Sequence, residues 1–132
     1  MAFQGFPSSS ILKNGATVVA WEETVDSNEF GRSRYIFAKI ISTQGEESAP
    51  FLVNSYLKGE QGGSQVASLD NGDFLISYRS SSDNSIKYQI FDNTGAKIGS
   101  EITAYSSGSV SLGNVVSLGN GKIGFGLITS DG

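Results

Sequence analysis

The chain has 132 residues, a formal net charge of −4 at pH 7, and neither Cys nor His. The missing Cys excludes disulfides, and the lack of both residue types removes the usual soft ligands for zinc, copper and iron–sulfur clusters. Arg32, Arg34 and Arg79 are the only arginines, so the chain has no basic patch that would favour nucleic acid or an anionic membrane surface as a partner. The length fits one domain, residues 1–132, and no apolar run is long enough for membrane insertion.

The first part of the chain reads as short strands separated by turns. The pair Asn14-Gly15 predicts a two-residue hairpin of type I′, which needs positive φ at both central positions. A polar loop is expected over residues 23–33, and Pro7 is expected to end a short first strand. Strands are predicted at 2–6, 11–13, 16–22, 34–42 and 50–54, with a turn at 43–45.

The same order then returns in the second part of the chain. The pair Asn71-Gly72 takes the place of Asn14-Gly15, and the turn at 93–95 takes the place of the turn at 43–45. The pair Asn120-Gly121 begins a third copy of the pattern, which the chain follows for two strands. Strands are predicted at 65–69, 73–79, 85–92, 97–103, 115–118 and 122–128.

This self-similarity is the strongest signal in the sequence. Each unit takes about fifty residues, the length of a propeller blade, and the units cover roughly 8–56, 64–105 and 109–132. The prediction is therefore an all-β chain of antiparallel four-stranded repeats that resemble propeller blades, about two and a half in number. A β-sandwich is the alternative, although a sandwich does not by itself predict an internal repeat.

The second strand of each unit has large apolar side chains on one face and small ones on the other. Phe74 and Ile76 alternate with Leu75 and Ser77, and Phe125 alternates with Gly124 and Gly126. This pattern predicts a sheet that is packed on both faces. The residues expected to be buried are Val19, Trp21, Phe74, Ile76, Tyr78, Ile86, Ile90 and Phe125.

Three stretches of the sequence resemble a known family. They are similar to tandem repeats in large secreted and surface proteins of bacteria and ciliates. The stretches are Val53-Asn54-Ser55-Tyr56, the run from Gln65 to Phe74 and the run from Tyr88 to Ile102. The resemblance implies propeller-like blades, an extracellular or cell-surface location and frequent association with adhesin or calcium-dependent modules. It implies no catalytic residues. The family usually has Trp at the positions of Tyr78 and Leu127, so the match is incomplete there.

Two groups of polar and aromatic residues are candidates for ligand binding. Tyr56 and Tyr105 lie in equivalent linkers between units and are able to stack on a sugar ring, although packing between sheets is the simpler use of such side chains. Arg79, Asp83 and Asn84 lie at and after the second strand of the second unit. The loops after the second strand of each unit also contain candidate calcium ligands, namely Asp26, Asn28 and Glu29 in the first unit and Asp83 and Asn84 in the second. Neither loop has the residue spacing of a calcium-binding loop, so a solvated loop is favoured.

The sequence favours a role without catalysis. Residues 81–88 resemble the Asp-box of sialidase-type propellers, which is a structural turn, and the three arginines do not form the cluster that a sialidase needs. Glu22 and Glu23 are adjacent on a strand and should point to opposite faces. The first hypothesis is a non-catalytic structural or adhesive module, the second is a carbohydrate-binding lectin, and a sialidase-like hydrolase is the remote third.

The repeat arithmetic also predicts a partner. Two and a half units do not close a ring, and the last strand, 122–128, should have an unpaired edge. We expect this edge to be completed by strand complementation, either by another copy of the chain or by the remainder of a longer chain. Within an assembly of copies, the segment around Phe3 is the expected complementing strand.

Overall fold

The computed structural model describes residues 4–27, 31–55, 61–80, 85–106, 110–119 and 122–129. These residues form ten β-strands and no helix, so the all-β prediction is confirmed. No helix long and apolar enough to cross a bilayer is found within these ranges. The strands are β1 (Gln4–Ile11), β2 (Thr17–Ser27), β3 (Gly31–Ile41), β4 (Phe51–Leu52), β5 (Gln61–Ser68), β6 (Phe74–Ser80), β7 (Ser85–Phe91), β8 (Lys97–Ser106), β9 (Val110–Gly119) and β10 (Lys122–Thr129).

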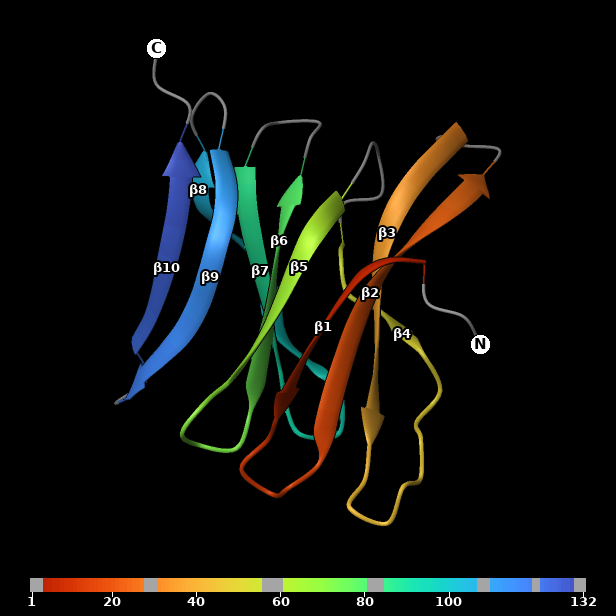
Figure 1. Ribbon diagram of the computed structural model, residues 1–132, viewed down its shortest axis with the longest axis vertical. Helices are drawn as coiled ribbons and strands as arrows, with labels where there is room; N and C mark the ends of the chain where they lie inside the picture. Colours follow the sequence, from red (N-terminus) through yellow and green to blue (C-terminus); the bar gives the residue numbers. More distant parts are fainter. Residues whose placement is uncertain are drawn as a thin grey trace.

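The strands form three antiparallel sheets that follow one another along the chain. The first two sheets have four strands each, in the orders β1-β2-β3-β4 and β5-β6-β7-β8, and the third pairs β9 with β10. Figure 1 shows the sheets side by side, with β5 next to β1 and β9 next to β5. Each sheet is a plain meander, which differs from the Greek-key order of an immunoglobulin-like sandwich. The predicted division into four-stranded units is therefore visible in the pairing.

The hairpin turns have glycines with positive φ, but they are not two-residue type I′ turns. Gly72 N–H donates to the Leu69 carbonyl at 3.1 Å, and Leu69 N–H donates to the Asp73 carbonyl at 2.9 Å. The loop therefore has three residues, and only its last residue, Gly72 with φ 96°, needs the left-handed region. Asn71 instead fixes the loop through its side chain, since its Oδ1 accepts from Asp73 N–H at 3.0 Å.

The turn of the first unit is built in the same way. Gly15 has φ 90°, and Asn14 Oδ1 accepts from Ala16 N–H at 2.9 Å. The positive φ predicted for Gly15 and Gly72 is thus confirmed, while the type I′ assignment is wrong. The third predicted turn, at Asn120-Gly121, lies outside the described residues.

Several strands are longer than predicted. β1 runs through Pro7 without a break, because Pro7 falls where the pairing register shifts between Gln4 and Ser8 and no ladder hydrogen bond is needed from it. Residues 4–6 and Ile11, which were expected in two separate strands, therefore belong to one strand, and Leu12 and Lys13 lie in the turn that follows it. β2 and β3 pair as far as Ser27 opposite Gly31, so most of the expected loop 23–33 is strand.

The core lies between the first and second sheets. On the first-sheet side, small and branched residues of β2 and β3 point inward, including Val18, Ala20 and Ile36, all 0% exposed. On the second-sheet side, β6 and β7 contribute Phe74 and Phe91, whose rings stack with centroids 5.1 Å apart. The large face of the second unit therefore packs on the small face of the first.

The predicted core residues divide into three groups. Trp21, Phe74, Ile76, Tyr78 and Ile86 are fully buried, as expected. Val19 and Ile90 are only half-buried, so these two positions differ from the prediction. The side chain of Phe125 lies outside the described part of the structure.

Candidate binding site between two hairpin turns

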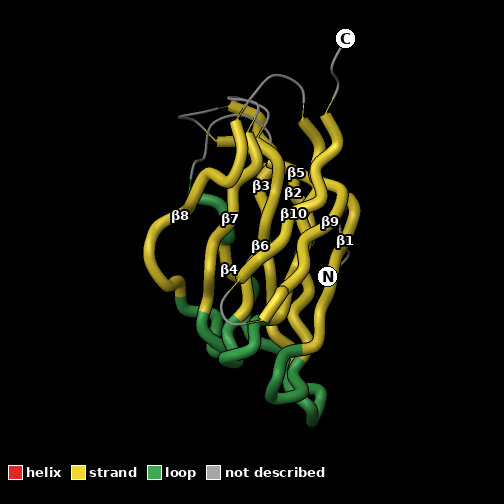
Figure 2. Tube along the Cα trace, turned by 90° about the vertical axis from the view of Figure 1, so that its left-hand side faces the viewer, coloured by secondary structure: helices red, strands yellow, loops and turns green. Residues whose placement is uncertain are grey.

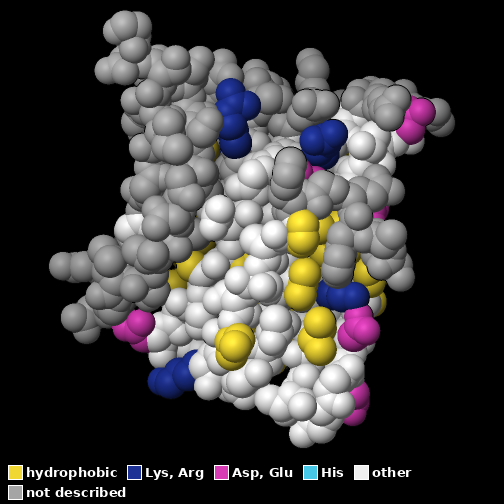
Figure 3. Space-filling view, viewed as in Figure 1, with side chains coloured by type: hydrophobic (Ala, Val, Ile, Leu, Met, Phe, Trp, Pro, Cys, Tyr) yellow, Lys and Arg dark blue, Asp and Glu magenta, His cyan; other side chains and the backbone are white. Residues whose placement is uncertain are grey.

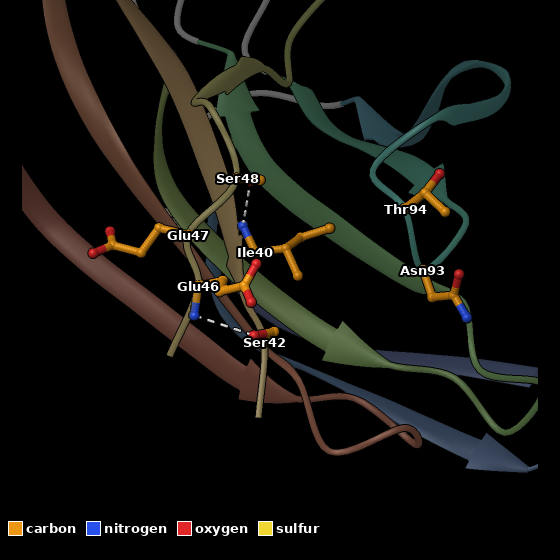
Figure 4. A pocket seen from close by; sticks show the side chains of 7 residues that line it. All are labelled: Ile40, Ser42, Glu46, Glu47, Ser48, Asn93 and Thr94. Carbon is orange, nitrogen blue, oxygen red and sulfur yellow. Dashed lines mark hydrogen bonds between the residues drawn. The ribbon is translucent and has the colours of Figure 1, made fainter. Parts of the chain in front are cut away.

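A pocket of about 300 Å³ opens between the β3–β4 turn of the first sheet and the β7–β8 turn of the second. Both turns lie at the end of the molecule where the described hairpin loops gather (Figure 2). Figure 4 shows Glu46 and Ile40 on one side and Asn93 and Thr94 on the other. The pocket is lined by Ile40, Ser42, Glu46, Glu47, Ser48, Asn93 and Thr94.

The two walls are equivalent turns of successive units. Ser42 Oγ accepts from the backbone N–H groups of Gln44 and Glu46, at 3.2 and 3.1 Å. Fifty residues later, Asp92 Oδ1 accepts from the N–H groups of Thr94 and Ala96, at 2.9 and 3.1 Å. These bonds hold each turn in one shape, because a polar side chain replaces a missing backbone partner. The turns predicted at 43–45 and 93–95 are confirmed.

The acidic side chains of the pocket have different roles. Glu47 forms an ion pair with Lys39, and this hydrogen bond and charge hold the pKa of the Glu47 carboxyl below its usual value. In Figure 4, Glu47 points away from the pocket, whereas Glu46 extends toward the space beside Ile40. Glu46 and Asn93 are both exposed, so their polar groups are available to a ligand.

The floor of the pocket is part of the contact between the sheets. Ile40 and Phe51 pack under Gly95, where an added Cβ would lie 3.1 Å from the Phe51 ring and 3.4 Å from Ile40 Cδ1. Phe51 in turn meets Phe91, with ring centroids 5.4 Å apart. The two turns are therefore fixed relative to each other by a tight apolar contact, which makes the pocket a preformed one.

Two of the sequence-predicted ligand residues, Arg79 and Tyr105, lie toward the end of the strands opposite to the pocket. Arg79 is half-buried on β6, opposite Ile86, and Ile86 is opposite Tyr105 on β8, so Arg79 and Tyr105 share one row across the sheet. The side chain of Tyr105, like all of Tyr56, Asp83 and Asn84, lies outside the described part of the chain. The structure thus places Arg79 and Tyr105 in one register and leaves the rest of this candidate site untested.

The candidate calcium ligands of the first unit are placed only in part. Asp26 is exposed near the end of β2, and Asn28 and Glu29 lie outside the described residues. No group of three or more acidic, His or Cys side chains suited to a metal ion occurs among the side chains that the structure describes.

Glu22 and Glu23 point to opposite faces, as predicted. Glu22 is 4% exposed and its Oε1 accepts from Gly63 N–H of β5 at 3.2 Å. Glu23 lies on the other face, where its Oε1 accepts from Trp21 Nε1–H at 3.1 Å. The two carboxylates are therefore separated by the sheet, and Glu22 serves as a contact between sheets.

The sequence reasoning missed the pocket residues Glu46, Asn93 and Ser48. One polar turn repeats after fifty residues, at Ser42–Gly45 and at Asp92–Gly95. This repeat predicts the two turns, but it does not predict the pocket between them. Comparison of the chain with known protein families, with curated proteins and with solved structures found no match. Its function is therefore inferred from its own residues.

Proposed function

We propose that the chain is a non-catalytic structural and adhesive repeat module of an extracellular or cell-surface protein, in which four-stranded units stack like propeller blades. The observation that carries the proposal is the contact between the first two sheets. Val18, Ala20 and Ile36 of one unit are covered by Phe74 and Phe91 of the next. An interface of this kind repeats wherever one unit follows another, as in other stacked-repeat proteins.

The outer face of the first sheet supports the same proposal. By register, Ile11 lies beside Thr17, and Val19 lies on the same face two residues further along β2. Ile11 is 69% exposed, and Val19 and Phe37 are half-buried. Figure 3 shows hydrophobic side chains gathered over β2 and β3 on this side. The equivalent positions of the second sheet, Phe74 and Ile76, are fully buried by the first sheet, so this face is suited to a further unit.

Carbohydrate binding is the second candidate, and the turn pocket favours it. Ile40 offers an apolar floor, while the Glu46 carboxylate and the Asn93 amide offer acceptors and donors for sugar hydroxyl groups. A pocket built from equivalent turns would recur at each junction between units. Its open shape fits the end of a glycan chain rather than an enclosed small molecule.

A glycan array separates the two candidates. The wild-type chain and the variant Asn93→Ala are applied at increasing concentration, with Asn71→Ala as a control in an exposed turn that does not line the pocket. Saturable binding that Asn93→Ala removes and Asn71→Ala retains would establish the lectin function. Silence of all three proteins, with the unfolding behaviour described in the Discussion, would favour the structural module.

A further inference from the structure

The hairpin loops of the first two sheets each contain an exposed asparagine followed by glycine. These pairs are Asn14-Gly15, between β1 and β2, and Asn71-Gly72, between β5 and β6. Asparagine is chemically labile in proteins, and it reacts most easily before glycine, which has no Cβ to obstruct attack by its backbone nitrogen on the side-chain amide. Both loops are therefore candidate sites of spontaneous deamidation.

The reaction uses water and no other reagent. The glycine nitrogen loses its proton to base in the solvent and forms a bond to the asparagine Cγ. The bond from Cγ to Nδ2 breaks, and Nδ2 leaves as ammonia with a proton from water. Water then opens the cyclic imide to aspartate or to β-linked isoaspartate. The β-linked product has one more carbon in its backbone, which alters the length of a loop that sets the register of its strands.

The fold holds the reacting groups of both pairs in place. Gly15 N–H donates to the Leu12 carbonyl at 2.9 Å. Gly72 N–H donates to the Leu69 carbonyl at 3.1 Å. Each asparagine Oδ1 also accepts from the backbone N–H two residues further along the chain. These bonds must break before the nitrogen is deprotonated and the amide turns toward it, so both pairs react when the loop opens locally.

The two loops differ in the residue that follows the glycine. In the second loop this residue is Asp73, and Asn71 Nδ2 donates to Asp73 Oδ2 at 3.0 Å. Together with the bond from Asp73 N–H to Asn71 Oδ1, this contact holds the Asn71 amide at both ends. In the first loop the same place is taken by Ala16, so Asn14 has the backbone bond but no carboxylate partner at that position.

We propose that Asn14 and Asn71 are sites of spontaneous deamidation, and that Asp73 slows the reaction at Asn71, so that Asn14 is modified first. The bond from Asn71 to the Asp73 carboxylate must break as the loop opens, which lowers the population of the reactive conformation. The negative charge of the carboxylate also opposes the loss of a proton from the nearby Gly72 nitrogen. The proposal goes beyond the proposed function, because it concerns the chemistry of the loops alone.

The two sites serve as references for each other in one sample. Their loops lie side by side, since Lys13 Nζ of the first donates to the Asp70 carbonyl of the second at 3.0 Å (Figure 1). The full chain is kept in mildly alkaline buffer and digested over time with pepsin at low pH, where the reaction is slow. Mass spectrometry then follows the peptides that contain each asparagine. We expect Asn14 to react about two- to tenfold faster than Asn71, the factor that one ordinary hydrogen bond gives.

Replacement of Asp73 by Ala reproduces the residue of the first loop. Asp73→Ala should raise the Asn71 rate to that of Asn14, while the Asn14 rate and the urea midpoint stay as in the wild type and show that the variant is folded. Asp73→Asn keeps the size of the side chain but loses the charge, so its Asn71 rate should lie between the two. The matched control is Asp70→Ala, which removes a carboxylate from the same loop and leaves the bonds between Asn71 and Asp73, and Asn71 should stay slow.

Unfolding removes the protection, so the two asparagines of the wild type should react at similar rates in urea. A folded wild type in which neither asparagine reacts, or in which Asn71 reacts as fast as Asn14, would overturn the proposal. A rate ratio that persists in urea would assign the difference to the neighbouring sequence instead of the fold. Equal acceleration by Asp70→Ala and Asp73→Ala would assign it to charge alone, and a slower Asn71 in Asp73→Ala would show that the carboxylate assists the reaction.

Discussion

Replacing Gly62 by Ala should weaken the contact between the first two sheets. An added Cβ at Gly62 would lie 2.2 Å from Glu22 Oε1, far inside van der Waals contact. Glu22 is 4% exposed, so its carboxylate cannot simply swing into water, and moving it breaks the bond from Gly63 N–H. A hydrogen bond to a charged group contributes about 1.5–3 kcal/mol, and we expect the free energy of unfolding to fall by about that amount.

A double-mutant cycle separates this contact from any other effect of the substitution. In a Glu22→Ala background the obstructing carboxylate is absent, so Gly62→Ala should be neutral or slightly stabilising, as Ala usually is in place of Gly within a strand. In a Glu22→Gln background, which keeps the size of the side chain, the cost should persist. Urea unfolding followed by the fluorescence of Trp21, the only tryptophan, measures all of these variants. A coupling energy near zero between positions 22 and 62 would refute the reasoning.

Three further predictions follow from the packing and the turns. Phe74→Ala should cost about 3–5 kcal/mol of unfolding free energy, since Phe74 is 0% exposed and stacks on Phe91; a cost below about 1 kcal/mol in urea unfolding would contradict the core assignment. Gly72→Val should lower the thermal unfolding midpoint more than Gly72→Asn does. No atom lies within 4 Å of the added Cβ, so the difference depends only on backbone strain at positive φ, which Asn tolerates better than Val. Equal midpoints for the two variants would contradict this prediction. The Thr94 hydroxyl and backbone N–H groups hold the pKa of Asp92 below its ordinary value of 3.8. The ionised carboxylate therefore stabilises the folded state above pH 3.8, and this stabilisation is lost as the pH falls through the lower pKa of the folded state. Asp92→Asn should remove that part of the acid transition, and an unchanged acid transition in the variant would show that the turn carboxylate does not contribute.

The fold was predictable from the sequence because the signals repeat. Alternation in β2 and β6, glycines at equivalent turns and the spacing of about fifty residues all indicate four-stranded units, and the pairing confirms them. Local details were harder to predict. Asn14-Gly15 and Asn71-Gly72 fit both a two-residue and a three-residue hairpin loop, and the choice depends on the register of the strands, which the pair alone does not set.

The strand lengths show the same limit. Residues 23–27 are mostly polar and are expected to form a loop, yet they pair in register with β3, because the ladder continues outward from the buried pair of Ala20 and Ala38. Strand propensity is a weak guide where a neighbouring strand supplies the hydrogen bonds. Pro7 is expected to end a strand, but a register shift in β1 accommodates it.

The candidate site was predictable only in part. Repetition identifies the turns at Ser42 and Asp92, but no sequence signal says that they lie next to each other across two sheets. That proximity comes from the packing of Ile40 and Phe51 against Gly95 and Phe91, which are about fifty residues away in the chain.

The central claim is that the first two sheets are stacked units of one structure, joined by a shared core. Equilibrium unfolding in urea tests it directly when Trp21 fluorescence reports on the first sheet and hydrogen exchange at residues 74–80 and 85–91 reports on the second. The account predicts one transition with the same midpoint for both probes, which Glu22→Ala shifts to lower urea for both together. Two separate midpoints, with Glu22→Ala moving only that of the first sheet, would contradict it.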